Sequence, residues 1–484
     1  MLFNSYLFIL IFIPLCLLGY FLLNGFKKYT VAQCFLLGMS LWFYGYFNYY
    51  YLLIIVISIF ANYGLYHFIG KFRGTKKSKT LMILGVTANL CVLGFFKYTD
   101  FFIDNINFVF KSNLPLLHIL LPLGISFFTF QQISFIVDTY KGKVGKYGFL
   151  HYASFVAFFP QLVAGPIVTH DELINQFEDL QKKRFNTENF TKGLFMFAIG
   201  LSKKVLIADV FGAVVNYGYV ASERLNTVSA WIVILCYTFQ IYFDFSGYSD
   251  MAIGLAKMFN IDLPINFNSP YRSVNINDFW DRWHMTLTRF FTKYVYIPLG
   301  GNRKGKAKLV LNILIVFFLS GLWHGAGWTF IIWGIMHGLL SIISRAIKKP
   351  TNKILCVLSG FVTFIFINIT WVFFRADTVT DAIFILGKAF SFNFAPVDPI
   401  IINAFRTPEL IQLFALADVE QKFPNIIAVI YLITAFVITF LLPNSKKMYD
   451  RFKPNILTFV FTFLLFIWSF LSLSGVSTFL YFNF

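Results

Sequence analysis

Long apolar segments, separated by short polar stretches, run along almost the whole chain. Each approaches the ~20 residues that an α-helix needs to cross a bilayer. They are continuous and do not alternate with polar residues, which is typical of membrane helices and argues against a membrane β-barrel. The twelve segments lie near residues 5–25, 31–47, 49–69, 80–98, 115–138, 193–216, 230–256, 309–326, 328–344, 354–374, 425–443 and 456–474.

Two further apolar stretches do not fit the same pattern. Residues 150–168 and 286–299 have flanks of the cytoplasmic type at both ends, so neither is expected to cross. Backbone of this kind is tolerated at membrane depth only when it is buried in protein. We predict re-entrant or interfacial helices in both places.

The composition agrees with a polytopic membrane protein. The 484 residues are 58% hydrophobic and 20% aromatic, and only 13% are charged. A soluble chain needs more polar residues than this to cover its surface. Because no long linker or internal repeat interrupts the pattern, we predict a single membrane-embedded domain over residues 1–484. Its fold class is all-α, with about 12 crossing helices and the re-entrant or interfacial ones.

The net charge of +18 does not change the predicted fold class, but its distribution predicts how the chain is oriented in the membrane. The basic residues form short clusters between apolar segments, a pattern that marks cytoplasmic loops and does not indicate a nucleic-acid site. With these loops inside, the N-terminus is predicted outside, and twelve crossings return the C-terminus to the same side. The clusters lie at residues 27–28, 71–79, 141–146, 181–184, 302–308, 345–349 and 446–447.

Neither the first segment nor the cysteines add a further feature. No Lys or Arg precedes the first apolar run and no small-residue cleavage site follows it, so we expect a membrane helix and not a cleaved signal. The five cysteines lack paired spacing, which predicts neither a zinc site nor a disulfide framework. The least hydrophobic extracytoplasmic excursion is expected around residues 392–422.

Candidate chemistry is concentrated between residues 239 and 337. Asp244 and Asp250 interrupt an apolar segment, where carboxylates are costly and usually paired or functional. Six residues apart, they face different sides of a helix, so packing roles are at least as well supported as catalysis. Asp278 is predicted to cap a helix that begins at Phe279.

That predicted helix brings three polar or aromatic groups to one face. Trp280 and His284 are four residues apart, and Asp281 and His284 are three apart. A carboxylate beside an imidazole fixes its tautomer and raises its basicity, as a proton-handling site requires. The alternative is an interfacial helix with its tryptophans at headgroup level. The spacing does not decide between the two.

His324 lies deeper. A straight helix rises roughly 24 Å from Lys308 to His324, within a hydrocarbon core of ~30 Å. Gly325 and Gly327 follow and let other groups approach the backbone. An ionisable residue at this depth favours a functional site over a core histidine bonded to a carbonyl. His337 is a weaker candidate, for which helix packing is the preferred interpretation, and His67, His118, His151 and His170 receive no role.

Two buried histidines can carry out acyl transfer. A neutral imidazole takes the proton of a hydroxyl as that hydroxyl attacks an activated acyl group, and a second histidine or a backbone N–H supplies a donor to the oxyanion. No GxSxG nucleophile elbow is present, so direct transfer from a thioester is favoured over a serine acyl-enzyme. Metal binding is not expected, because no HExxH motif or grouped carboxylates complete a ligand shell.

Five stretches in this order resemble the membrane-bound O-acyltransferase family, in the bacterial branch typified by the alginate O-acetylation membrane protein. A WHG triplet alone is weak, but the ordered set over about residues 90–376 is specific. Residues 377–484 match only as additional C-terminal membrane helices. The stretches are "FPQLVAGPIVTHDEL" (159–173), "DFSGYSDMAIGLAKMFNIDLPINFNSPY" (244–271), "FWDRWHMTLTRFFTKYVYIPLGGNRKG" (279–305), "GLWHGAGWTFIIWGIMHG" (321–338) and "WVFFRA" (371–376).

The resemblance implies the site and the surrounding fold. His324 matches the near-invariant membrane histidine, which acts as general base, and His284 matches a second polar position that is occupied by His or Asn. The helices are expected to surround a funnel or tunnel that joins a cytoplasmic donor to an extracytoplasmic acceptor. The supporting and tunnel-lining positions are Asn277, Trp280, Asp281, Arg282 and Trp323.

The resemblance also implies the reaction. An acetyl group would pass from a thioester, acetyl-CoA or an acyl carrier, to an alginate-like exopolysaccharide or peptidoglycan, with no bound cofactor. The chain has no sizeable soluble domain to hold a polysaccharide, so an extracytoplasmic acetyltransferase partner is expected, in a bacterial inner membrane. The "YIPLGGNRKG" stretch favours this branch over D-alanyl transfer to teichoic acid.

Two other classes of function stay open at this stage. A proton-coupled transporter or flippase also uses buried histidines and aspartates, although the inverted repeats typical of transporters are not evident. A structural scaffold for polysaccharide export would use the histidines for packing only. Loss of function in a folded His324→Ala variant separates the enzyme from the scaffold.

Overall fold

The computed structural model describes residues 1–348, 350–405, 423, 425–473 and 480. These residues form helices and irregular segments with no strand among them, which confirms the all-α class. They divide into two compact units. The first comprises Met1–Phe197, Ser249–Pro264 and Pro454–Thr458, and the second Ala198–Tyr248, Ile265–Lys453 and Phe459–Phe484. The single domain predicted over residues 1–484 stays a prediction.

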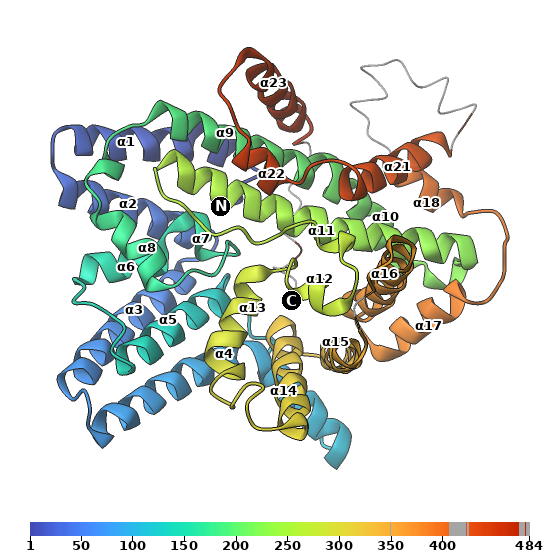
Figure 1. Cartoon of the computed structure of the whole chain (residues 1–484), viewed down its shortest axis with the longest axis horizontal. Coiled ribbons are helices and arrows are strands. Elements are labelled where there is room, and N and C mark those ends of the chain that lie inside the picture. Colours follow the sequence, from blue (N-terminus) through green and yellow to red (C-terminus); the bar gives the residue numbers. More distant parts are fainter. Residues whose placement is uncertain (349, 406–422, 424, 474–479, 481–484) are drawn as a thin grey trace. The chain divides into compact units, whose positions relative to one another are not determined.

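The first unit holds the N-terminal helices. In it α1 packs against α2, and α3, α4 and α5 pack against one another (Figure 1). The chain passes into the second unit within α9. The helices are a π-helical turn (Phe8–Phe12), α1 (Ile13–Gly25), α2 (Tyr29–Gly45), α3 (Tyr49–Lys71), α4 (Lys76–Phe110), α5 (Ile125–Tyr140), α6 (Phe149–Ala157), α7 (Phe159–Leu162), α8 (His170–Glu178), a 3-10 turn (Gln181–Lys183) and α9 (Thr187–Ser202).

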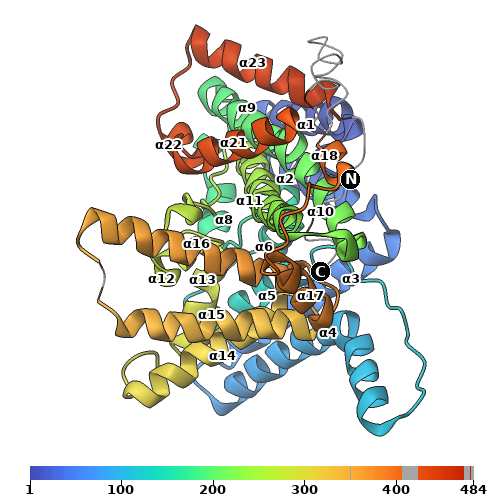
Figure 2. The same ribbon diagram turned by 90° about the vertical axis from the view of Figure 1, so that its right-hand side faces the viewer.

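The second unit contains the candidate site. Here α14, α15 and α16 lie side by side with α15 in the middle (Figure 2). The helices that lie wholly or mostly in it are π-helical Lys203–Ala208, α10 (Asp209–Val220), a 3-10 turn (Ser222–Arg224), α11 (Thr227–Met258), a 3-10 turn (Pro270–Arg272), α12 (Ile276–Trp280), α13 (Met285–Phe291), π-helical Thr292–Tyr296, α14 (Lys306–His324), α15 (Trp328–Ala346), α16 (Lys353–Arg375), α17 (Val379–Ala389), α18 (Pro399–Asn403), α21 (Ile426–Phe440), α22 (Ser445–Asp450) and α23 (Ile456–Leu471).

Seven of the predicted segments are helices long and apolar enough to cross a membrane, counted over the described residues. Two more, α21 and α23, are apolar but shorter. The number of about 12 crossings, and the side on which each terminus lies, stay predictions. The seven spans are Phe8–Gly25, α3, α4, α11, α14, α15 and α16.

Two predicted segments have a different local structure. Residues 111–122 are not helical, because Pro115 and Pro122 lack an N–H and Asp100 accepts a hydrogen bond from the Leu117 amide at 2.8 Å. The segment near 193–216 stays helical, but the π-helical turn Lys203–Ala208 lies between α9 and α10.

The two stretches predicted not to cross are short, broken helices. Residues 150–168 contain α6 and α7, which meet at Phe158 two residues before Pro160. Residues 286–299 contain α13 and the π-helical turn that follows it. Their position relative to a membrane stays a prediction. The excursion near 392–422 is described only as far as Phe405, and the rest lies outside the described residues.

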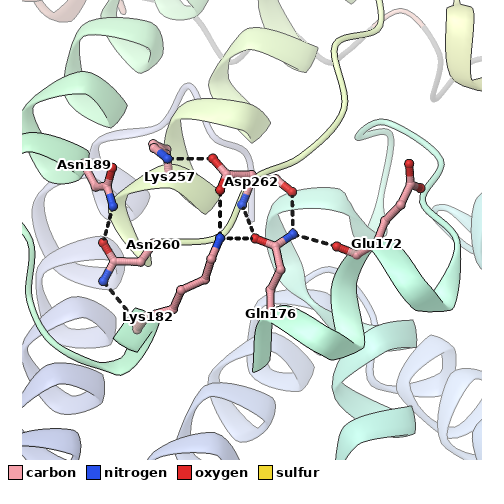
Figure 3. A network of polar contacts seen from close by, with 7 residues as sticks. All are labelled: Glu172, Gln176, Lys182, Asn189, Lys257, Asn260 and Asp262. Atoms are coloured by element: carbon pink, nitrogen blue, oxygen red, sulfur yellow. Dashed lines mark hydrogen bonds and ion pairs between the residues drawn. The ribbon is translucent and has the colours of Figure 1, made fainter. Parts of the chain in front are cut away.

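A polar network closes the end of α11 against α8 within the first unit (Figure 3). Asp262 accepts hydrogen bonds from Lys182 Nζ at 2.8 Å and Lys257 Nζ at 2.6 Å. Gln176 pairs with the Asp262 backbone in both directions, at 2.8 and 2.9 Å. Asn260, held by Asn189 at 2.9 Å, donates to two backbone carbonyls near Lys182. The network fixes the turn that leaves α11.

The network predicts a pH-dependent contribution to stability. Partial burial alone would raise the pKa of Asp262, but the two ammonium groups outweigh it and lower the pKa. The stabilisation is therefore complete above the unfolded pKa near 3.9 and is lost as pH falls through the lower folded value. Asp262→Asn should cost about 0.2–1 kcal/mol, because the pair is half exposed and screened. Thermal unfolding in detergent at pH 7 and pH 3 measures it, and an equal difference at both pH values would contradict the assignment.

Candidate active site

The α14–α15 hairpin carries the central histidine. The two helices are antiparallel and approach closely at Gly321 and Gly334, where an added Cβ would overlap a backbone carbonyl of the other helix. Only glycine permits this contact. His324 is the last residue of α14, and the extended residues Gly325–Gly327 lead into α15. The imidazole is thus placed at the buried turn of the hairpin, with 3% of the residue exposed.

Aromatic rings surround His324. The ring centroids of Trp323, Trp333 and Phe374 lie 4.9, 5.1 and 5.2 Å from that of its imidazole. Trp323 also contacts His284, with 6.0 Å between ring centroids. The two histidines predicted from the sequence therefore share one aromatic cluster, joined by the predicted residue Trp323.

His284 does not lie within a helix, as the sequence predicted. The helix ends at Trp280, and His284 takes a left-handed backbone conformation (φ 45°, ψ 52°) before α13 begins at Met285. The helix breaks because the Met285 N–H donates to the Asn266 carbonyl at 3.0 Å, while the Asn268 N–H donates to the Arg282 carbonyl. Hydrogen bonds to the backbone of the loop at Asn266–Asn268 thus replace those that a continuous helix would form.

Asn266 takes the place predicted for Asp281 as the partner of His284. Its Oδ1 lies 3.2 Å from His284 Nδ1. The same oxygen accepts hydrogen bonds from the Thr286 N–H at 3.2 Å and the Thr286 hydroxyl at 3.0 Å. Because a backbone N–H requires an acceptor, this atom is the amide oxygen, and the proton of His284 must lie on Nδ1. Nε2 is left as an acceptor, without a hydrogen-bond partner among the described residues.

Burial keeps His284 neutral. The residue is fully buried and its ring packs edge-on against Phe245, with centroids 4.7 Å apart. Desolvation of the charged form lowers the pKa of His284 to about 3. A neutral imidazole protonated on Nδ1 accepts a hydrogen bond at Nε2 and cannot donate one there. The oxyanion donor expected from the second histidine is therefore not supported by its tautomer.

Two other sequence predictions for this stretch, those for Asp281 and Asp278, are wrong. Asp281 is exposed and does not share a helix face with His284. Asn275, not Asp278, caps α12, accepting a hydrogen bond from the Asp278 N–H at 2.9 Å. The Asp278 carboxylate instead accepts from Arg282 Nε at 2.8 Å, which places Arg282 in a local ion pair.

Three of the predicted residues line a cavity of about 250 Å³ within the second unit: Asn277, Trp280 and Asp281. Trp280 also contacts Trp333, with ring centroids 5.7 Å apart. Because Trp333 contacts His324, the aromatic cluster continues from the cavity wall to the central histidine.

His337 and Asp244 have structural partners. His337 Nε2 donates to Thr370 Oγ1 at 3.0 Å, because that hydroxyl itself donates to the Ile367 carbonyl. Asp244 pairs with Lys204 at 2.6 Å, with both side chains buried. These contacts agree with the packing role preferred for His337 and with the packing alternative that the sequence left open for Asp244. The sequence did not identify the partners of His284, His324 and Asp244, which are Asn266, Trp333 and Lys204. Their spacing along the chain does not indicate these contacts.

In the part of the chain that the structure describes, no group of three or more His, Cys, Asp or Glu side chains lies close enough together to hold a metal ion. The absence of a metal stays a prediction.

Comparisons with known proteins decide the family. The model of MBOAT, the membrane-bound O-acyltransferase family, matches residues 138–375. The chain is 41% identical over 520 residues to a peptidoglycan O-acetyltransferase of Helicobacter pylori, with 100% of this chain and 98% of the relative covered. The chain belongs to the membrane-bound O-acyltransferase family. The acyltransferase class and the multi-pass membrane character predicted from the sequence are thereby confirmed.

Two other members of the family cover less of the chain. A probable alginate O-acetylase AlgI of Pseudomonas aeruginosa is 39% identical over 400 residues, which is 81% of this chain and 75% of the relative. A teichoic acid D-alanyltransferase of Bacillus subtilis is 27% identical over 261 residues, 51% of this chain and 66% of the relative. The O-acetyltransferase names among these relatives support an acetyltransferase.

Proposed function

We propose that this membrane O-acyltransferase moves an acetyl group from a cytoplasmic thioester to an extracytoplasmic polysaccharide, with peptidoglycan as the first candidate acceptor. The observation that carries the acceptor is the similarity to a peptidoglycan O-acetyltransferase along the whole chain. An alginate-like exopolysaccharide is the second candidate, supported by a relative that matches 81% of the chain.

His324 is the proposed general base. Its neutral imidazole takes the proton from the acceptor hydroxyl as the oxygen attacks the thioester carbonyl. The new C–O bond forms, the C–S bond breaks, and the same proton passes to the departing thiolate. Burial among Trp323, Trp333 and Phe374 keeps water from competing for the acyl group.

His284 is proposed to orient the hydroxyl and not to donate to the oxyanion. Its Nε2 accepts a hydrogen bond, and Asn266 holds the ring in that tautomer. Trp323, which contacts both imidazoles, bears an indole N–H suited to the oxyanion. We further propose a bacterial inner membrane with both termini outside. If the hydroxyl acylated at His324 is not that of the sugar itself, an extracytoplasmic acetyltransferase partner passes the acetyl group from the new ester to the sugar.

The test compares cells with and without the chain. Peptidoglycan, exopolysaccharide and any teichoic acid are purified from both, treated with mild base, and assayed for released acetate and D-alanine. Loss of acetate from either polymer supports the proposal and identifies the acceptor. Loss of D-alanine instead favours the teichoic acid branch, and unchanged amounts of both would exclude acyl transfer to these polymers.

A further inference from the structure

Two basic loops of the first unit lie side by side, where α3 and α5 end and α4 begins (Figure 1). Residues 71–79 form the turn from α3 into α4, and residues 141–146 follow α5. The first loop contains five basic residues and the second contains three, and neither contains an acidic residue. The structure therefore brings together two basic clusters that are distant in the sequence.

The two basic loops are held together by hydrogen bonds. Arg73 Nη2 donates to the Gly142 carbonyl at 3.4 Å, and the Tyr66 hydroxyl donates to the Gly145 carbonyl at 2.8 Å. The same hydroxyl accepts from the Tyr147 N–H at 3.1 Å. Gly142 has a φ of 71°, and a Cβ at this position would overlap the Arg73 guanidinium. Only glycine permits this close approach of the loops.

The charges of the two basic loops are not neutralised by the surrounding protein. Lys77 lies over the Phe72 ring, with its Nζ 4.0 Å from the centroid, and has no carboxylate partner among the described residues. Like charges gathered in this way repel one another, so an anionic group would stabilise the surface. Four more lysines are exposed and form no ion pair with other residues that the structure describes: Lys76, Lys79, Lys143 and Lys146.

The start of α4 strengthens the preference for an anion. The positive end of a helix dipole favours acidic side chains in the first turn, yet that turn contains Lys76, Lys77 and Lys79 and no acidic residue. The helix is capped by Thr75, which accepts from the Ser78 N–H at 3.3 Å. The three lysines therefore oppose the dipole of α4, and a bound anion would remove this unfavourable interaction.

The apolar surface beside these charges indicates the class of anion. About one turn from the nearest lysines, Phe68 on α3 and Ile83 and Leu84 on α4 are 55%, 49% and 57% exposed. Both helices are long and apolar enough to cross a membrane. Side chains suited to lipid at this distance place the basic residues at the level of the headgroups, where long lysine side chains can reach phosphate. A soluble acidic protein would have to compete with headgroups that are always present there.

From this arrangement we propose that the two basic loops bind the headgroup of an anionic phospholipid, such as phosphatidylglycerol, in the predicted cytoplasmic leaflet. Arg73 and the lysines of both loops face the phosphate, and the exposed apolar side chains of α3 and α4 contact the acyl chains. Basic clusters of this size beside the end of a membrane helix are typical of sites for anionic lipid. Lipid binding here does not require acyl transfer, so loss of either property leaves the other standing.

The test measures the dissociation constant of the first phosphatidylglycerol bound to the full chain, by native mass spectrometry. Lys76→Gln and Lys143→Gln, one from each loop, should each raise it about 5-fold, the effect of one basic residue near an anionic surface. The constant for phosphatidylcholine should stay the same. Lys446→Gln is the matched control, because that lysine already pairs with Asp450 at 2.7 Å. A wild-type constant in either loop variant would overturn a site shared by the two loops.

A variant that keeps every charge tests the geometry. Gly142→Ala should push Arg73 away and separate the loops, which weakens phosphatidylglycerol binding without removing a basic residue. Gly145→Ala is its control, because the nearest atom to an added Cβ there is 3.8 Å away, in the Tyr147 ring. Equal binding by the two variants would contradict the assignment.

An acidic carrier protein is the alternative ligand for the two basic loops. Acetylated acyl-carrier protein is supplied as donor to the wild type and to Lys143→Gln, both in phosphatidylcholine vesicles. An unchanged KM for the carrier, together with weaker phosphatidylglycerol binding, supports the lipid site. A raised KM with unchanged lipid binding would overturn it and assign the surface to a protein partner.

Discussion

His324→Ala is expected to lower acetyl transfer by about 10²- to 10⁴-fold, the usual contribution of a general base. Alanine keeps the backbone N–H and C=O, so the helical hydrogen bonds at the end of α14 stay in place. The variant should therefore reach the membrane at normal abundance. Ester-linked acetate on the purified polymers, normalised to the amount of protein, measures the loss.

A second substitution and a control separate chemistry from packing. His324→Gln keeps much of the volume and a hydrogen-bonding group but is no base at neutral pH, so it should be as inactive as His324→Ala. His67→Ala, at an exposed position on α3, should transfer acetate at the wild-type rate. Normal acetylation in a folded His324→Gln protein would remove His324 from the role of base.

Lys204→Met is expected to destabilise the protein by about 3–5 kcal/mol, the cost of removing one partner from a buried ion pair. Lys204 Nζ lies 2.8 Å from Asp209 and 2.6 Å from Asp244. Only 4% of the lysine side chain and 2% of the Asp244 side chain are exposed, so the carboxylate left behind has no access to water. Thermal unfolding in detergent and abundance in membranes both report the effect.

The pair is tested by a rescue. Lys204→Met with Asp244→Asn removes both buried charges, and most of the lost stability should return because Asp209, with 24% of its side chain exposed, can turn toward water. Lys203→Met is the neighbouring control. Its amine contacts the hydroxyls of Ser246 and Ser445, which remain satisfiable without a cation, so the loss should be smaller. A double variant no more stable than Lys204→Met would show that the ion pair is not the cause.

The sequence contained enough to predict the long helices and the position of His324 at the end of one apolar segment. Continuous apolar runs of membrane length give spans such as α3 and α16 because a helix satisfies its backbone hydrogen bonds within the segment itself. The rise along α14 places His324 at its buried end for the same geometric reason.

The break before His284 could not be predicted in this way. No Gly or Pro interrupts residues 279–291, so local propensity favours one continuous helix. The break is imposed by the loop at Asn266–Asn268, which takes the backbone hydrogen bonds that a helix would form. The Lys204–Asp244 pair was hidden for a related reason, since the two residues are forty positions apart and meet only through packing.

The left-handed backbone conformation at His284 restricts the residue types that can occupy this position. Side chains other than glycine rarely adopt positive φ, and Asn, Asp and His are enriched several-fold among those that do. A β-branched or bulky residue at this position would have to distort the loop as well as lose the imidazole. Of the tolerated types, His and Asn both offer a neutral polar group, and these are the two that the family resemblance implies at the second polar position. Backbone geometry and chemistry thus narrow the choice together, and a substitution that satisfies only one of them should not persist.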